Sequence, residues 1–128
     1  MTGKTHRSIT LHLPYPVSLN NLYRVFRGKI VPSQEAVRFG NEVKYACSQQ
    51  KPKMFRGEVS MVVEIRPRMT ITGRASKVCV DIDNPLKKLL DAMQGIVYEN
   101  DKQVKRLYVY YGEPIEKGAI VVTVEENE

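Results

Sequence analysis

The chain has few cysteines, no long apolar run, and no repeated or low-complexity segment. Its two cysteines, Cys47 and Cys79, lack the CxxC spacing of a zinc site, and neither His6 nor His12 is placed to complete one. Both thiols are therefore predicted to pack in the core. Residues 1–13 lack the apolar centre of a signal peptide, and no apolar run is long enough to cross a bilayer. We expect a cytoplasmic protein that has no membrane partner.

Length and charge narrow the class of protein further. A chain of 128 residues, of which 42% are hydrophobic, is predicted to form one domain over residues 1–128. The 20 lysines and arginines outnumber the 14 aspartates and glutamates, which gives a formal net charge of +6. This charge favours an anionic partner, and nucleic acid is favoured over a membrane surface because no basic amphipathic helix stands out.

Several short segments alternate apolar and polar residues, the pattern that predicts half-buried strands. The clearest are Ser8–Leu13, Glu58–Arg66, Gln103–Tyr111 and Ala119–Glu125. A further strand is predicted over Val78–Asp83. Tyr23–Val31 is predicted to form a hairpin about Arg27-Gly28-Lys29, because glycine permits the positive φ that a tight turn needs.

Two segments show the three- and four-residue spacing of amphipathic helices. Gln34–Gln50 carries its small and apolar residues on one face, with Ser33 as the N-cap. The second helix is predicted to have Asn84 as its cap, Pro85 at its first position and Gly95 just past its end. Strands and helices mix without a regular βαβ repeat. The predicted class is therefore α+β, a single domain with a mainly antiparallel mixed sheet and two helices packed on one face.

Two aspartates stand at the end of the predicted strand Val78–Asp83. Asp81 and Asp83 are two residues apart, so a strand directs both carboxylates to one face. Carboxylates held that close repel each other unless a cation shares the site. The same pattern also suits an ordinary strand end with a solvated acid and a helix cap. In a basic chain it indicates a divalent metal beside a polyanion.

Further charged residues follow this pair. Lys87 lies one turn into the second helix, near its positive N-terminal end, and Asp101 lies in the loop after that helix. Two or three carboxylates and a phosphate oxygen are ligands that Mg²⁺ accepts, which suits phosphodiester hydrolysis. Lys87 also has an ordinary ion-pair partner in Asp91 at i+4, and Lys88 faces similarly. The residues alone leave open which lysine would serve a site.

The order of these motifs resembles the RusA family of phage and bacterial Holliday junction resolvases. The matching segments are Asp81-Ile82-Asp83-Asn84 with Lys87, Leu90–Met93, Gly95–Asp101, Gln103-Val104 and, near the start, Pro16–Arg24. The match is colinear over roughly Ile9 to Val124, and the compound motif is more specific than a DxD pair alone.

The resemblance implies a Mg²⁺-dependent endonuclease, with Mn²⁺ as a substitute, that acts in recombination and repair. It implies a homodimer that resolves four-way DNA junctions by paired symmetric nicks in a bacterial or phage-infected cell. Carried over to this chain, Asp81, Asp83 and Asp101 are the metal ligands, and with Lys87 they form the catalytic set. Asp91 is expected to support these residues from just outside the ligand set.

The later acidic loop departs from the family pattern at one position. Family members often have two consecutive acids there, and in this chain the first is Asn100. Asp101 keeps the second carboxylate, and Glu99 is a further candidate ligand.

A dimer has a physical reason on a four-way junction, because the junction has approximate twofold symmetry and must be cut on two opposed strands. The cluster Tyr108, Tyr110 and Tyr111 is one candidate for the interface, and packing on a sheet face explains these tyrosines equally well. Phosphate contacts position DNA without reading its sequence. The candidate DNA-binding residues are Tyr23, Arg24, Lys29, Arg68, Arg74 and Lys77.

Three other functions fit parts of the pattern. A broader nuclease for flaps or forks would use the same site. A non-catalytic junction-binding protein explains the charge but leaves the carboxylates unexplained. A DxD nucleotide-sugar transferase needs a nucleotide-binding domain, for which the chain has no room.

Overall fold

The computed structural model describes residues 7–16, 23–70, 72–73 and 85–127. Within these residues the elements follow in the order β1 (Ser8–Leu13), β2 (Tyr23–Phe26), β3 (Lys29–Pro32), α1 (Gln34–Gln49), β4 (Val59–Arg66), α2 (Leu86–Met93), the 3₁₀ helix η1 (Asp101–Gln103), β5 (Val104–Tyr111) and β6 (Ala119–Glu126). The predicted strand Val78–Asp83 and the predicted cap Asn84 lie outside the described residues.

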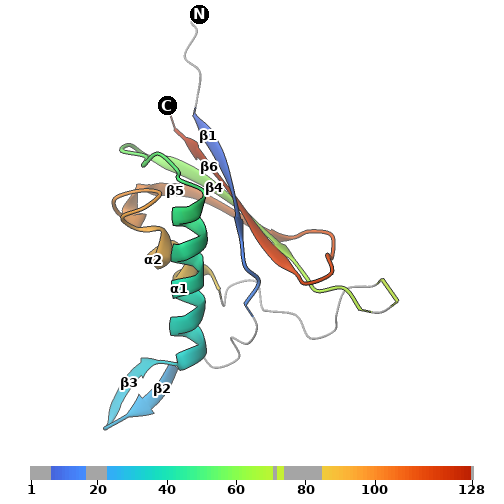
Figure 1. Ribbon diagram of the computed structural model, residues 1–128. Helices are drawn as coiled ribbons and strands as arrows, with labels where there is room; N and C mark the ends of the chain where they lie inside the picture. The colour runs from blue at the N-terminus through green and yellow to red at the C-terminus, as the bar shows by residue number, and fades with distance from the viewer. Residues whose placement is uncertain (1–6, 17–22, 71, 74–84, 128) are drawn as a thin grey trace, which may run out of the picture.

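Four strands form one mixed sheet in the order β1-β6-β4-β5 (Figure 1). β6 pairs antiparallel with β1 on one side and with β4 on the other, whereas β5 lies parallel to β4. Parallel neighbours need a long crossover, and the one between β4 and β5 contains α2. The predicted α+β class with a mainly antiparallel mixed sheet is confirmed.

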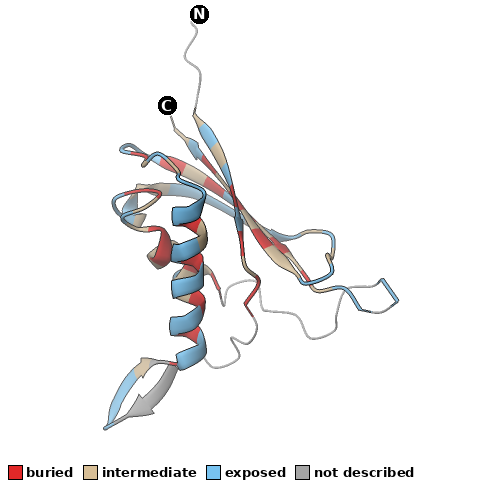
Figure 2. Cartoon of the chain, viewed as in Figure 1, coloured by how far each residue is buried: buried red, intermediate tan, exposed pale blue. Residues whose placement is uncertain are grey.

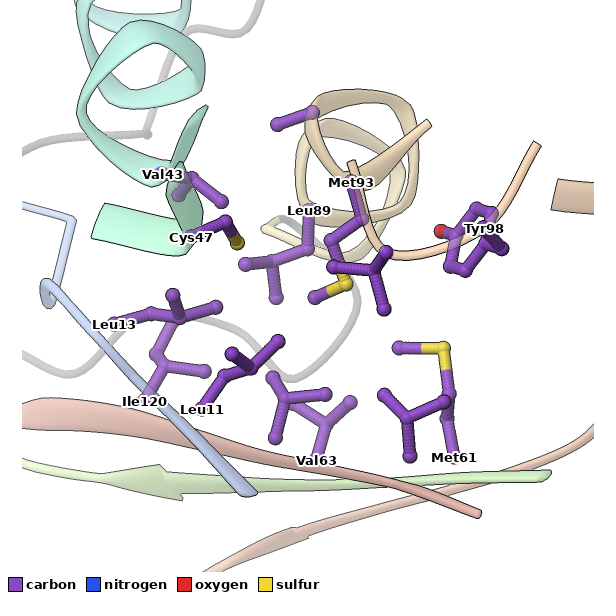
Figure 3. Packing of buried hydrophobic residues seen from close by; sticks show 14 of the residues in the cluster. Leu11, Leu13, Val43, Cys47, Met61, Val63, Leu89, Met93, Tyr98 and Ile120 are labelled. Atoms are coloured by element: carbon purple, nitrogen blue, oxygen red, sulfur yellow. The ribbon is translucent and has the colours of Figure 1, made fainter. Parts of the chain in front are cut away.

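The two helices cover the same face of this sheet (Figures 1 and 2). Alternate residues of β4 are buried under them, which is the period expected of a strand with one face in the core. Cys47 is fully buried, as predicted for a core thiol, and Cys79 lies outside the described residues. Figure 3 shows the layer in which helix and strand side chains meet. Its buried members include Leu11, Leu13, Met61, Val63 and Ile120 from the sheet and Val43, Cys47, Leu89 and Met93 from the helices.

The helix boundaries follow from local hydrogen bonding. The Ser33 hydroxyl accepts from the Ala36 N–H at 3.1 Å, which confirms the predicted N-cap of α1. Pro85 occupies the N-cap position of α2 rather than its first helical position, and its carbonyl accepts from Leu89 N–H at 2.9 Å. Gly95 has a φ of +82°, as predicted for the residue past the helix end.

The hairpin β2–β3 extends from the start of α1 away from the four-stranded sheet (Figure 1). Phe26 pairs with Lys29, so the turn consists of Arg27 and Gly28 alone. Both have positive φ, 51° and 75°, which is the geometry of a two-residue type I′ turn. Lys29, predicted in the turn, is therefore the first residue of β3. Among the described residues, no helix is both long and apolar enough to span a membrane.

Candidate active site

The end of α2 and the segment after it bring two carboxylates toward one buried side chain. After Met93 the chain reverses at Gly95, whose N–H donates to the Tyr98 carbonyl at 2.7 Å. Its positive φ is a conformation that glycine adopts without strain. The chain then passes through Glu99–Asp101, which we call the acidic loop, and enters β5 after η1.

Tyr98 is fully buried and belongs to the core layer (Figure 3). Its hydroxyl donates to the Leu90 carbonyl of α2 at 2.7 Å. Burial raises the pKa of the Tyr98 phenol, and the negative charges of Asp101 and Asp91 raise it further. The phenol therefore stays protonated at neutral pH. The two carboxylates that raise this pKa come from different elements, Asp91 from α2 and Asp101 from η1.

The backbone of Asp101 is fixed by side chains on either side of it. Its N–H donates to the Gln94 Oε1 atom at 2.9 Å, which ties the acidic loop to the end of α2. The Asn100 side chain accepts from the Lys102 N–H at 2.8 Å and caps η1. The Asp101 carboxylate takes no part in these bonds, so it is available to another group.

Gln103 fixes the acidic loop from the opposite side. Its Oε1 atom accepts from the N–H groups of Glu99 and Asn100 at 2.8 and 2.9 Å, completing a capping box. Its Nε2 atom donates to the carbonyls of Phe55 and Gly57 at 3.0 and 2.8 Å. This use of its side chain explains why Gln103 belongs to η1 rather than to the predicted strand. One amide thus ties the acidic loop to the segment that leads into β4.

Glu99, the further candidate ligand, has a partner of its own. Its carboxylate pairs with the Arg56 guanidinium on the exposed surface. Within the acidic loop, Asp101 is therefore the better candidate for holding a cation.

Lys87 and Lys88 lie in different surroundings, which the sequence could not distinguish. The Lys87 Nζ atom lies 3.8 Å from the Asp91 Oδ2 atom, and the two side chains are 70% and 43% exposed. A pair this exposed contributes only about 0.2–0.5 kcal/mol to helix stability. Lys88 is half-buried and, with Lys44 and Asp91, lines a cavity of about 200 Å³ between α1 and α2. Lys87 is the lysine more accessible to a large substrate.

The other two predicted ligands, Asp81 and Asp83, lie outside the described residues, so the three-carboxylate site stays a prediction. In the described part of the chain, no group of three histidine, cysteine, aspartate or glutamate side chains could hold a metal ion. The Asp101 carboxylate fits Mg²⁺ in chemistry, because it is a hard oxygen ligand that is half-buried and keeps access to solvent.

The hairpin β2–β3 carries three of the predicted DNA-binding residues. Tyr23 and Arg24 lie on β2, and only their backbone is described. Lys29 is exposed at the start of β3, next to the exposed turn residue Arg27. The projecting end of the hairpin therefore presents two cations to solvent.

The other predicted DNA-binding residues follow β4. Arg68 is half-buried, and its guanidinium carbon lies 5.6 Å from the centre of the Tyr15 ring, a cation–π geometry. Arg74 and Lys77 lie outside the described residues.

Gln94, Tyr98 and Gln103 position the site, and none of them was predicted to do so. Asn100 and Gln103 do have the spacing of a capping box, which could have indicated the second of them. Gln94 and Tyr98 bond residues seven and eight positions away, a spacing that has no recognisable sequence pattern.

The site thus belongs to a small α+β protein that holds carboxylates at the end of a helix and carries an exposed basic hairpin. The family model described as endodeoxyribonuclease RusA matches residues 14–125 of the chain. Since this match covers most of the sequence, the chain belongs to the RusA family of endodeoxyribonucleases. A search of curated proteins found no match.

Proposed function

We propose that this endonuclease depends on Mg²⁺ and resolves Holliday junctions by paired symmetric nicks, acting as a homodimer. The observation that carries the proposal is the acidic loop of a RusA-family chain, fixed to both α2 and the start of β4. Metal-dependent phosphodiester hydrolysis needs carboxylates in a defined geometry, and side-chain hydrogen bonds to the backbone supply that rigidity.

The proposed roles follow from chemistry. Asp81, Asp83 and Asp101 would hold the ion, which when bound would polarise the scissile phosphate and lower the pKa of the attacking water. Lys87 would offset negative charge that grows on the phosphate. Its exposed ammonium group beside Asp91 supports this role over Lys88, which faces α1.

Charge and symmetry support a branched DNA substrate. The net charge of +6 and the basic hairpin favour a polyanion. A homodimer would present two equivalent sites to the two strands that must be cut. A monomer with the same site would nick only once in each encounter.

The test compares cleavage of a synthetic four-way junction with that of a three-way junction, a flap and a plain duplex. We expect Mg²⁺-dependent cleavage of the four-way junction, with both nicks made in a single encounter, and none after chelation. Equal rates on flaps and forks would replace the proposal by a broader branched-DNA nuclease. Binding without any nick would leave a junction-binding protein.

Two matched variants test which of the two lysines takes the electrostatic role. Lys87→Ala should slow cleavage about tenfold or more, whereas Lys88→Ala should change it less. The opposite order would transfer the electrostatic role to Lys88.

A further inference from the structure

The strand β5 is exposed on both faces and along one edge. On the core side its neighbours in β4 are fully buried, yet Leu107 and Tyr111 remain 42% and 47% exposed. On the other side Tyr108 is 63% exposed and stacks near Tyr110, with ring centres 5.5 Å apart. Within the described part of the chain, β4 is the only strand that pairs with β5. Long apolar edge strands of this kind favour pairing with another strand.

The opposite edge of the sheet is capped at one residue by a side chain of the same chain. The His12 N–H of β1 donates to the Gln50 Oε1 atom at 2.9 Å, and the Gln50 Nε2 atom donates to the His12 carbonyl at 2.9 Å. Gln50, at the end of α1, therefore occupies the position that another strand would take beside β1. The described residues supply no corresponding side chain along β5.

The backbone of β5 fixes which residues can pair across its open edge. The Gly112 N–H donates to the Ile65 carbonyl of β4 at 2.9 Å. Alternate residues of a strand direct their backbone groups to the same neighbour, so from Arg106 onward the even-numbered residues face β4. Leu107 and Val109 consequently direct their N–H and carbonyl groups toward the open edge. Before Arg106 the register with β4 shifts, and Lys105 has no partner residue in β4.

We infer that β5 pairs antiparallel with β5 of a second copy, with the twofold axis at Val109, so that two four-stranded sheets join into one. In this register Leu107 lies opposite the partner's Tyr111, and Tyr108 lies opposite the partner's Tyr110. Apolar groups thus meet apolar groups on both sides of the axis.

A charge pair follows from Gly112. A Cβ atom at this position would overlap the Glu64 carboxylate, so that carboxylate covers the glycine on the outer face of the sheet. In the register centred on Val109, Arg106 lies opposite the partner's Gly112. Arg106 therefore meets Glu64 of the partner subunit. A register centred on Tyr108 or Tyr110 would place Arg106 opposite the partner's Tyr110 or the partner's Pro114 instead, which is why we place the axis at Val109.

This inference deepens the proposed function and rests on its homodimer. Its test uses Tyr108→Cys and Tyr110→Cys, because residues 108 and 110 form a close, non-hydrogen-bonded pair in this register. Cα atoms in such pairs lie about 4.5 Å apart, within the range that a disulfide spans. Under mild oxidation we expect covalent dimers when the two variants are mixed, and the background level of the unsubstituted chain when each is alone.

The outcomes are separable. Cross-linking of Tyr108→Cys alone, or of Tyr110→Cys alone, would move the twofold axis and overturn the register. A dimeric protein with no cross-link in any sample would overturn the interface. A monomer at all concentrations would leave the edge to another occupant, such as DNA or a different protein, and overturn the inference.

A charge exchange tests the same register without cysteines. Arg106→Glu should weaken dimerisation about tenfold, because two symmetry-related ion pairs become repulsive. Glu64→Arg should do the same, and both changes in one chain should restore the dimer. Lys117→Glu is the matched control. Failure of the double variant to recover would contradict the pairing.

Junction cleavage measured on the same samples separates this inference from the function on which it rests. A protein that cross-links in the expected register but never nicks a junction keeps this interface and loses the proposed function. A dimer that cleaves junctions but never cross-links keeps the function and loses this interface.

Discussion

The acidic loop and the basic hairpin are built in opposite ways. The N–H groups of the acidic loop donate hydrogen bonds to the side chains of Gln94 and Gln103, and the loop directly follows the buried Tyr98. The hairpin β2–β3 extends away from the sheet, and its residue Ile30 is 76% exposed (Figure 1). An isolated two-stranded hairpin is at best marginally stable in water. One region is fixed by the core, and the other reaches beyond it.

This difference between the acidic loop and the hairpin shows how DNA binding and DNA cleavage can be assigned to separate regions of a small protein. Carboxylates that hold a cation tolerate little displacement, whereas phosphate contacts work through charge over longer distances. Changes in the acidic loop should therefore affect cleavage, and changes in the hairpin should affect affinity. Variants of either region can break that division.

The largest effect is expected from the carboxylates. Asp101→Asn should lower the cleavage rate about 10²–10³-fold while junction binding survives, because only the negative charge is removed. The fold should be retained, since Asp101 uses its backbone N–H to bind Gln94. Cleavage and gel-shift assays on the same junction provide the measurement. Asp81→Asn and Asp83→Asn should behave alike.

Asp91→Asn is the matched control for Asp101→Asn, because both acids lie near Tyr98. Asp91→Asn should lower the cleavage rate about tenfold, as expected of a group that supports the metal ligands without being one. Equal losses in both variants would make Asp91 a ligand in its own right.

A smaller effect is expected from substitutions of Gln103, whose hydrogen bonds fix the acidic loop in place. Gln103→Ala leaves two N–H groups and two carbonyls without their protein partner, so we expect a loss of about 2 kcal/mol in the free energy of unfolding. Cleavage should fall about tenfold with junction affinity unchanged. Urea denaturation and cleavage assays test both expectations.

Gln103→Glu keeps the acceptor oxygen and removes the donor to Phe55 and Gly57, so its loss of stability should be intermediate. Full cleavage by Gln103→Ala would show that the acidic loop does not need this fixation. Rigidity would then not distinguish the function of the acidic loop from that of the hairpin.

The hairpin should affect affinity alone. Arg27→Asn with Lys29→Gln removes two charges and preserves the turn, because Asn-Gly is a favoured type I′ sequence. Junction affinity should fall about tenfold, and the slope of log K against log salt should decrease by about 0.9 for each phosphate that the protein no longer neutralises. Fluorescence anisotropy over a range of salt concentrations measures both.

Lys53→Gln with Lys117→Gln removes the same charge from exposed positions outside the hairpin. If this control lowers affinity equally, overall charge rather than the hairpin binds DNA. A decrease in the maximal cleavage rate of the hairpin variant would also contradict the division of labour.

The smallest expected effect is a loss of folding stability at alkaline pH, which comes from two buried side chains. Burial raises the pKa of the Cys47 thiol from 9.0 to about 11. The pKa of Tyr98 is raised above its usual value by burial and by Asp101 and Asp91. The folded chain thus keeps protons that the unfolded chain releases at lower pH. Stability should be fully present below about pH 9 and decline as the pH rises toward 11.

Urea denaturation at increasing pH measures this decline, and Cys47→Ala should reduce its slope. An identical slope in the variant would show that Cys47 is not responsible.

The local structure was largely predictable from sequence. β1 has the predicted bounds, and α1 ends one residue earlier than predicted. Both elements could be predicted because alternation and capping are local properties of the sequence. The parallel pairing of β5 with β4 was not predictable. Alternation shows which face of a strand is buried but not which strand lies beside it.

The site was predictable only in part. Spacing and resemblance predicted site roles for Asp101 and Lys87, because carboxylates and lysines carry recognisable chemistry, and these roles stay predictions. The fixation of Asp101 by Gln94 was not visible, since a glutamine seven residues away gives no periodic signal. The placement of Asp81 and Asp83 stays a prediction. Charge chemistry was thus easier to infer than the hydrogen bonds that hold it in place.

The position of β6 has a consequence for biosynthesis. This segment, residues 119–126, lies between β1 and β4, and Ser8 pairs with Glu125. A nascent chain therefore cannot unite the two halves of its sheet until those residues leave the ribosome. Pairing over such a sequence separation is slow compared with local folding. A premature stop before residue 119 should thus release a chain that lacks the strand joining β1 to β4.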